Sequence, residues 1–360
     1  MSWSFPIGRL LGSELRVHAA FFLLLAWIGA AAWISAGPFA AIASVAFILA
    51  LFACVVAHEF GHALMARRFG ISTPDITLLP IGGMARLEKM PDQPLQEIAV
   101  ALAGPAVNVL IWAAIMLASG GQIDIGSLQS LEDPSEGFFS RLAAVNLFLA
   151  AFNMIPAFPM DGGRVLRAVL AIRLNRVRAT RLAAHAGQAI AFLFGFWGLT
   201  AGNPLLLLIA VFVFMAAAAE SSDVALHASA RDVPARDAMI TSFESLSPDD
   251  TLEAAARSLV RTTQAEFPVL GSDGRLLGVL TRSAIASGLQ QGAAPKNVSA
   301  AMASDILQVR LEDPLEVALD GLARPDAVAV AVTDRHGNFL GYITKENIGE
   351  WIVLRQWKTR

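Results

Sequence analysis

Residues 53–68 read ACVVAHEFGHALMARR and place two histidines and a glutamate within an otherwise apolar segment. On a helix, His58 and His62 lie on one face about one turn apart, so both imidazoles can reach a single metal ion. In metalloproteases with the pattern H-E-x-x-H, the histidines bind zinc and the glutamate, here Glu59, is the general base. The alternatives are a hydrogen-bond network between helices or the hydrated end of one helix.

The composition predicts a membrane protein. Of the 360 residues, 55% are apolar and only 16% are charged, whereas soluble domains contain about 25% charged residues. Ionisable side chains are costly inside a bilayer and usually mark functional sites, which favours the metal-site interpretation. The net charge of -3 and the lack of a basic tract with aromatic residues argue against nucleic acid as a partner. The single cysteine, Cys54, is expected to be a packing residue.

Six apolar blocks predict membrane-spanning helices, each of which needs about 20 residues. The fourth block is the weakest because Asn146 and Asn153 interrupt it. We expect Asn108 and Asn146 to form hydrogen bonds between helices. The second block follows the first almost at once, which predicts a retained anchor rather than a cleaved signal peptide. The blocks are Val17–Ala36, Phe39–Met65, Ile98–Ser119, Phe139–Ile155, His185–Ala201 and Pro204–Ala219.

The distribution of basic residues predicts the orientation of these spans. Basic residues gather in the loop between the second and third spans and in the loop between the fourth and fifth, whereas the other three loops have none. We therefore expect the basic loops and both termini in the cytoplasm, and the protein in the cytoplasmic membrane. The loop after the fourth span contains Arg164, Arg167, Arg173, Arg176, Arg178 and Arg181.

Asp161 is the candidate for a third metal ligand, since a catalytic zinc usually has three protein ligands. The second and fourth spans enter from the same side and reach His58 and Asp161 after similar lengths, so the topology places both residues at one level. Asp161 lies in NMIPAFPMDGGR, residues 153–164, where the two prolines should break the helix and the Gly pair should allow a tight turn. In the alternative interpretation, Asp161 only caps the helix that follows.

The segment ITLLPIGGMARLE, residues 76–88, predicts a short β hairpin that dips back toward the site. Non-helical backbone at membrane depth is tolerated only where protein or water surrounds it. An exposed strand edge near Gly82 and Gly83 would bind an unwound substrate by strand addition. A plain surface hairpin would give the same sequence pattern.

After Glu220 charged residues become frequent, which predicts a soluble domain at residues 226–360 behind a transmembrane domain at residues 1–225. The soluble part contains two related copies, at about residues 235–290 and 297–356. Each copy is expected to form a helix, a strand, a glycine-containing turn, a strand and a helix. The copies are recognised from DTLEAAARSLV and GRLLGVLTRSAI in the first, and from DPLEVALDGLA and GNFLGYITKENI in the second.

Together, HEFGH, NMIPAFPMDGG, IGGMARLE, AGPAVN and the repeated C-terminal module resemble the site-2 protease family of intramembrane zinc metalloproteases with a CBS-domain pair. The resemblance implies an α-helical polytopic membrane protein of about six transmembrane helices, with a short membrane-associated β hairpin and a cytosolic α/β CBS pair. It also implies one catalytic Zn²⁺ per chain, bound by His58, His62 and Asp161, with Glu59 as the catalytic base. Asn153 would stabilise the oxyanion, although a hydrogen bond between helices is the alternative for this residue.

The resemblance further implies that the substrates are transmembrane segments of membrane proteins, cut in regulated intramembrane proteolysis. CBS pairs often bind adenine nucleotides through the aspartate of a T-x-x-D pattern, but Ala284 and Asn347 occupy that position here. This departure argues against an adenine nucleotide and leaves a structural role or a homodimer through the CBS pair. A CBS-gated transporter or channel is the alternative function, and a non-catalytic membrane scaffold is a third.

Overall fold

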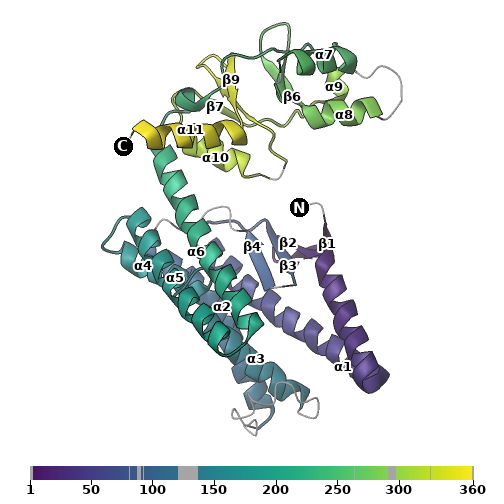
Figure 1. Ribbon diagram of the computed structural model, residues 1–360, viewed down its shortest axis with the longest axis vertical. Coiled ribbons are helices and arrows are strands. Elements are labelled where there is room, and N and C mark those ends of the chain that lie inside the picture. Colours follow the sequence, from purple (N-terminus) through teal and green to yellow (C-terminus); the bar gives the residue numbers. More distant parts are fainter. Residues whose placement is uncertain are drawn as a thin grey trace. The chain divides into compact units, whose positions relative to one another are not determined.

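The computed structural model describes residues 3–80, 82–86, 91, 93–120, 137–262, 264–290, 297–324 and 326–358. The chain forms two compact units, Met1–Ser222 and Asp223–Arg360. Most of the first unit is helical, and the second combines short strands with helices (Figure 1). This architecture confirms the predicted fold class.

The first unit opens with two strands that the sequence analysis did not predict. Strands β1 (Ser4–Leu10) and β2 (Ser13–His18) form an antiparallel hairpin. β2 pairs in parallel with β3 (Asp75–Leu79), and β3 pairs antiparallel with β4 (Gly82–Arg86), which gives the strand order β1-β2-β3-β4. The hairpin of β3 and β4 is the one expected around Gly82 and Gly83.

Helix α1 (Ala19–Arg68) contains the first two predicted spans as two legs that meet at Gly37. Gly37 has φ 86°, a left-handed conformation that glycine adopts without steric cost, and Pro38 begins the second leg. The Nδ1 atom of His18 accepts a hydrogen bond from the backbone N–H of Ala20 at 3.2 Å. This cap moves the start of the helix to Ala19, two residues after the predicted Val17.

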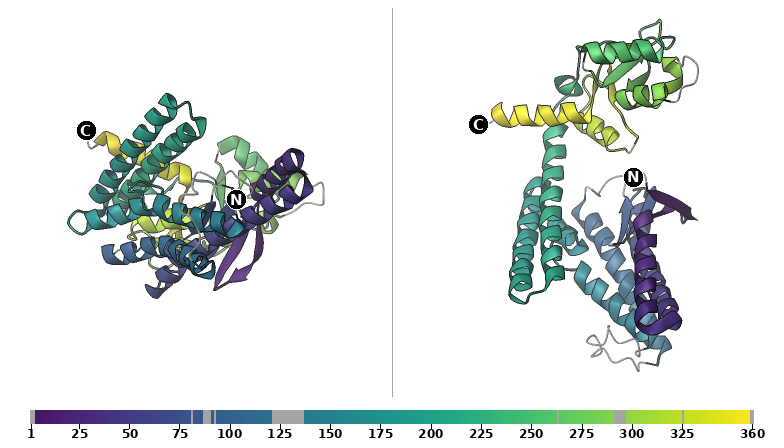
Figure 2. Two further views of the ribbon diagram at one scale, coloured as in Figure 1. Left: turned by 90° about the horizontal axis from the view of Figure 1, so that it is seen from below. Right: turned by 45° about the vertical axis from the view of Figure 1, so that its right-hand side comes forward.

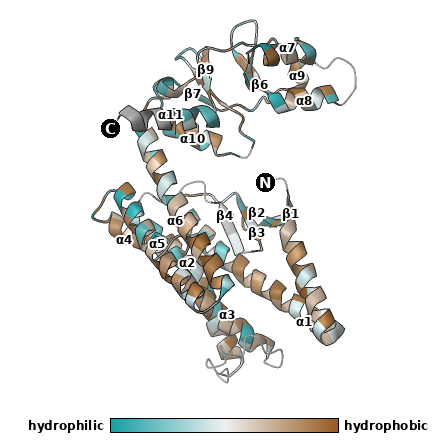
Figure 3. Cartoon of the chain, in the orientation of Figure 1, coloured by the Kyte–Doolittle hydropathy of each residue, from teal (hydrophilic) through white to brown (hydrophobic). Residues whose placement is uncertain are grey.

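Five further helices begin within the described part of the first unit, and large apolar side chains are exposed on them. Figure 3 shows many hydrophobic residues along these helices. Among the described residues, four helices are long and apolar enough to cross a membrane, namely α1, α2, α5 and α6. The fourth predicted span is a shorter apolar helix, α3. The five helices are α2 (Pro94–Ala118), α3 (Phe138–Asn153), α4 (Asp161–Ala171), α5 (Arg176–Thr200) and α6 (Pro204–Arg231).

The sheet packs on α1 through a cluster of buried apolar side chains. Val17 of β2 and Leu78 of β3 lie in this cluster with Phe21 and Phe52 from the two legs of α1. Figure 2 shows the strands beside the N-terminal leg. An aromatic side chain buries about 150–250 Å² of surface, so the packing of the strands on Phe21 and Phe52 strongly favours this position of the sheet. The sheet is therefore held next to the helix that carries the HEFGH motif.

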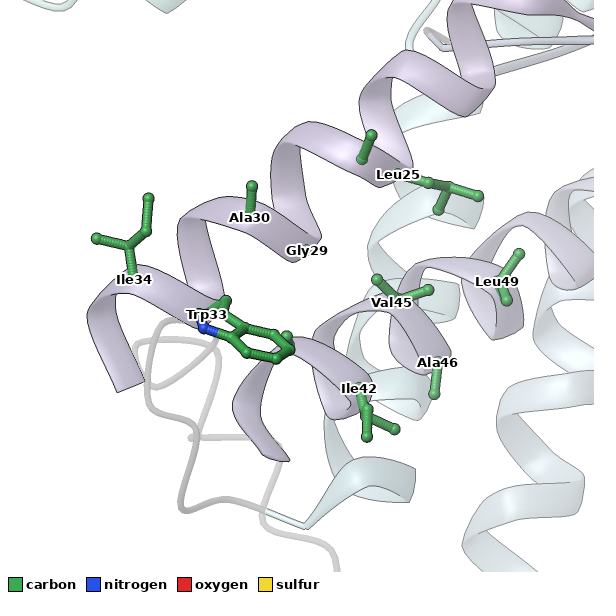
Figure 4. Close-up of a pocket in the computed structure, with 11 residues that line it drawn as sticks. Leu25, Gly29, Ala30, Trp33, Ile34, Ile42, Val45, Ala46 and Leu49 are labelled. Carbon is green, nitrogen blue, oxygen red and sulfur yellow. The ribbon is translucent and has the colours of Figure 1, made fainter. Parts of the chain in front are cut away.

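A cavity of about 790 Å³ lies between the two legs of α1. Figure 4 shows Leu25, Ala30 and Trp33 from the first leg and Val45 and Leu49 from the second around it. The lining side chains are all apolar. Apart from the indole N–H of Trp33, this lining offers no polar group that could orient a reacting peptide.

The second unit contains the two predicted copies, each with the expected order of elements. The first copy comprises α7, β5, β6 and α8, and the second comprises α10, β8, β9 and α11, with β7 pairing in parallel with β8. Each copy has its own apolar core. The elements are η2 (Ala235–Ala238), α7 (Leu252–Thr262), β5 (Glu266–Leu270), β6 (Leu276–Thr281), α8 (Arg282–Gln290), α9 (Val298–Ala301), β7 (Gln308–Arg310), α10 (Leu315–Leu322), β8 (Val330–Thr333), β9 (Phe339–Ile343) and α11 (Lys345–Lys358).

Candidate metal centre

The side chains of His58, His62 and Asp161 converge in the interior of the first unit. Both histidines lie on the second leg of α1, and Asp161 is the first residue of α4. The two Nε2 atoms are 3.0 Å apart. Oδ2 of Asp161 lies 3.3 Å from Nε2 of His58 and 3.2 Å from Nε2 of His62. All three residues are buried, with 4% to 7% of their surface exposed.

The elements that present these ligands follow from local sequence. The i, i+4 spacing places both imidazoles on one face of α1. Helix α3 ends at Asn153, and Pro156 and Pro159 lie in the non-helical segment that leads to Asp161. Asp161 then stands in the first turn of α4, where the helix dipole stabilises a carboxylate. The N-cap of α4 is Met160, so Asp161 is not the capping residue of this helix.

A backbone carbonyl fixes the orientation and the tautomer of His62. Its Nδ1 atom lies 2.8 Å from the carbonyl oxygen of Val100 on α2. A carbonyl can only accept a hydrogen bond, so Nδ1 carries the proton and donates it. In the neutral ring the Nε2 atom then has no proton, and its lone pair faces Asp161 and His58.

A chain of two buried asparagines fixes His58 in the same way. The Nδ2 group of Asn146 donates to the carbonyl of Leu142 at 2.8 Å, which leaves its Oδ1 to accept from Nδ2 of Asn108 at 2.9 Å. Oδ1 of Asn108 then accepts from Nδ1 of His58 at 2.5 Å. Because Leu142 offers only an acceptor, the direction of every bond in the chain is determined. In the neutral ring, Nε2 of His58 therefore also carries a lone pair and no proton.

With both imidazoles neutral, three electron-pair donors thus face one another. Oδ2 of Asp161 is buried and has no hydrogen-bond partner among the described residues. The lone pairs of these three donor atoms repel one another unless a cation lies between them. Ligands at tetrahedral positions about 2.0–2.1 Å from zinc lie about 3.3 Å from each other, close to the observed separations. The donor set of two imidazoles and a carboxylate and its spacing therefore fit zinc.

Gly104 of α2 supplies the space in front of the two imidazoles. A Cβ atom at this position would lie 2.2 Å from Nε2 of His62 and 2.7 Å from Nε2 of His58. Any side chain here would occupy the region in which a metal and its fourth ligand have to fit. Gly104 and Asn108 are four residues apart on α2, so one helix face provides both the space and the support for His58.

Glu59 lies beside the cluster, at the edge strand β4. A Cβ atom built on Gly83 would lie 2.7 Å from Cγ and 3.1 Å from Oε1 of Glu59. The glutamate is half-buried, so its carboxylate remains accessible to water and to a substrate backbone. The predicted base and the predicted strand edge are therefore in contact range of each other.

Asn153 is the last residue of α3 and is half-buried. Within the described part of the chain, no hydrogen bond joins its amide to the three ligands. The hydrogen bond between Asn108 of α2 and Asn146 of α3 confirms the expected contact between helices. The structure adds that Asn108 also bonds to His58, which the sequence analysis did not predict. The spacing of Gly104 and Asn108 on one helix face was the signal in AGPAVN that could have revealed this connection.

The chain is similar in sequence to known metalloproteases and to CBS domains. Residues 46–123 and 116–194 match the model of Peptidase family M50, and residues 232–290 and 298–353 match the CBS domain model.

Zinc metalloprotease MJ0392 of Methanocaldococcus jannaschii is 32% identical over 282 residues, covering 78% of each chain. Stage IV sporulation protein FB of Bacillus subtilis is 31% identical over 185 residues, which cover 51% of this chain and 57% of that protein. A solved site-2 protease from Methanocaldococcus jannaschii is 33% identical, has a TM-score of 0.47, and covers 61% of this chain and 95% of its own.

Proposed function

Because the chain belongs to peptidase family M50, the site-2 protease family of zinc metalloproteases, we propose that His58, His62 and Asp161 bind its zinc ion. The chain is a multi-pass membrane protein and an intramembrane metalloendopeptidase of this family. The observation that supports the ligand assignment is the convergence of three buried lone-pair donors. Family membership gives no support to the transporter alternative.

We assign the proton transfer to Glu59. Zinc bound at the three ligands would polarise the scissile carbonyl and lower the pKa of the attacking water. Glu59 directly follows the proposed ligand His58 in sequence and is half-buried, and we assign it to take the proton of this water and to return it to the amine of the leaving peptide. The hydrogen bonds from His58 to Asn108 and from His62 to the carbonyl of Val100 would keep both Nε2 atoms oriented to hold the metal.

Asn153 is proposed as a donor to the oxyanion that develops on the substrate carbonyl. Its amide makes no hydrogen bond among the described residues, so its N–H groups are free to donate. A single oxyanion donor contributes about 10²–10³ in kcat in other hydrolases. The proposal therefore predicts that the asparagine contributes to the rate more than to substrate binding.

The substrate is proposed to be a transmembrane or near-membrane segment that unwinds before cleavage. A helix hides its carbonyls in hydrogen bonds, so attack requires an extended segment. β4 is an edge strand of the four-stranded sheet, and Gly83 in this strand lies against Glu59. A substrate strand added to β4 would bring its carbonyls past the base.

The positions of the loops and the partners of the CBS pair are also proposals. The excess of arginine and lysine in two loops supports cytoplasmic termini and a cytoplasmic CBS pair. A homodimer through the CBS pair is proposed as the structural role of that unit. Ala284 has no side-chain acceptor for a ribose hydroxyl, so no adenine nucleotide is assigned there.

The test separates metal binding from proton transfer. Glu59→Gln in the full-length protein should keep one zinc per chain and abolish cleavage, and cells making it should accumulate specific membrane stubs that identify the substrates. Asp161→Ala should reduce the zinc content. Retained proteolysis in Glu59→Gln would reject the base, and an unchanged zinc stoichiometry in Asp161→Ala would remove this residue from the ligands.

A further inference from the structure

Arg167 of α4 is a buried arginine that contacts three different elements of the first unit. Only 1% of its surface is exposed. Its Nε donates to Oε1 of Glu97 on α2 at 2.6 Å, and Nη2 lies 2.5 Å from the same oxygen. Its Nη1 donates to Oε1 of Glu220 on α6. The guanidinium carbon lies 5.3 Å from the ring centre of Phe158.

These contacts reach the segments that hold the ligands in place. Phe158 is buried and lies three residues before Asp161, in the segment that leads into α4. Glu97 stands in the first turn of α2, one turn before Val100, whose carbonyl orients His62. An arginine in contact with both Phe158 and Glu97 therefore links the segment that leads into Asp161 to the helix whose carbonyl orients His62.

Stability alone does not account for this arrangement. A buried ion pair is often no more stable than apolar side chains of similar volume, because both ions lose their hydration. Here one guanidinium is bound by two carboxylates. The side chain of Glu220 is 34% exposed and could remain in water, yet it binds Arg167. The second carboxylate orients the planar guanidinium from α6 as well as from α2.

We infer that Arg167 is a positioning residue for Asp161, and that Glu220 makes this position depend on α6. The inference rests on the proposed role of Asp161 as a zinc ligand. Helix α6 ends at Arg231, and its residues after Ser222 belong to the second compact unit. Through Glu220, the helix that leads into that unit thus forms an ion pair with the helix of the proposed metal ligand.

The experiment measures metal binding and metal geometry rather than proteolysis alone. Full-length protein is stripped of metal, and Zn²⁺ affinity is measured by competition with a chromogenic chelator. The same samples are loaded with Co²⁺, whose visible absorption reports the coordination geometry. The variants are Glu220→Gln and Arg167→Lys. The matched controls are Asp223→Asn on the same helix and Arg173→Lys beyond the end of α4, both at exposed positions.

We expect Glu220→Gln to keep one metal per chain, to bind Zn²⁺ about 10-fold more weakly and to change the Co²⁺ spectrum, as supporting residues of metal sites do. Its kcat should fall while KM changes little. Arg167→Lys should show the same changes in larger degree, because lysine cannot bind two carboxylates as a planar fork. Both controls should match the wild type.

A folded Glu220→Gln protein with wild-type affinity and spectrum would overturn the dependence on α6. The same result for folded Arg167→Lys would overturn the positioning role. If Arg167→Lys does not fold, Glu220→Gln decides the inference, since its side chain is partly exposed and its shape is conserved. A wild-type chain that binds neither Zn²⁺ nor Co²⁺ would instead reject the proposed metal site and the inference with it.

Discussion

Nδ1 of His58 lies 2.5 Å from Oδ1 of Asn108, and both side chains are buried. The asparagine is held in turn by Asn146 and, through it, by a backbone carbonyl of α3. Helices α1, α2 and α3 therefore act together on one imidazole. Outer partners of this kind orient a metal ligand and raise its basicity, and they affect metal affinity without touching the metal.

Asn108→Leu should weaken zinc binding by about 10–100-fold, the usual effect of removing an outer partner of a metal-bound histidine. Leucine has a similar volume but cannot accept the Nδ1 proton, so His58 loses its fixed tautomer. Competition with a chelator measures the affinity. Asn108→Asp keeps an acceptor for His58 and should recover part of the loss. Equal zinc affinity in the wild type and in Asn108→Leu would contradict the orienting role.

Gly104→Ala should abolish zinc binding, because the new methyl group would lie 2.2 Å from Nε2 of His62. Metal analysis of purified protein gives the zinc content per chain. Gly195→Ala on α5 is the matched control, since its Cβ would meet no atom closer than Cβ of Ala210 at 3.6 Å. Full zinc occupancy in Gly104→Ala would show that the space beside the imidazoles is not needed for the metal.

The grouping of His58, His62 and Asp161 could be predicted from the sequence because its determinants are local or topological. Helix periodicity alone places His58 and His62 on one face. The depth of Asp161 in the membrane, relative to His58, follows from the number of residues between each of them and the start of its own span. Neither argument requires knowledge of which side chains pack together.

The residues that support the site could not be predicted in the same way. Arg167 belongs to a run of arginines that indicates a cytoplasmic loop, yet the structure buries it between two carboxylates. Its partner Glu97 is 70 residues away in sequence. The pairing of β2 with β3 likewise joins residues on either side of α1. Such pairings depend on tertiary packing, which hydropathy and spacing do not encode.

Gly83→Ala should lower kcat and leave the zinc content unchanged. The added Cβ would lie 2.7 Å from Cγ of Glu59 and would displace the proposed base. A misplacement of about 1 Å can cost about 10²-fold in rate. Cleavage of a membrane substrate by purified protein measures the effect. Gly8→Ala, in β1 of the same sheet, is the control because no atom lies within 4 Å of its Cβ. Wild-type cleavage by Gly83→Ala would argue against contact between β4 and the catalytic base.

The only tyrosine of the chain, Tyr342 in β9, permits a test of the second unit. Its side chain is buried, and its hydroxyl donates to the backbone carbonyl of Glu266 at 3.1 Å. Burial, and to a smaller extent the charge of Glu266, raises the pKa of Tyr342 to about 12. The unfolded phenol titrates near pH 10, so the stability contributed by the neutral hydroxyl is complete below about pH 10 and is lost as the pH rises toward 12.

Tyrosinate absorbance should therefore show a midpoint near 12 in native protein and near 10 in denaturant, and Tyr342→Phe should remove the signal. Glu266→Gln should lower the native midpoint by part of this difference, because desolvation remains when the charge is gone. A native midpoint near 10 would mean that water reaches the hydroxyl and that the core around β9 is more open than the structure shows.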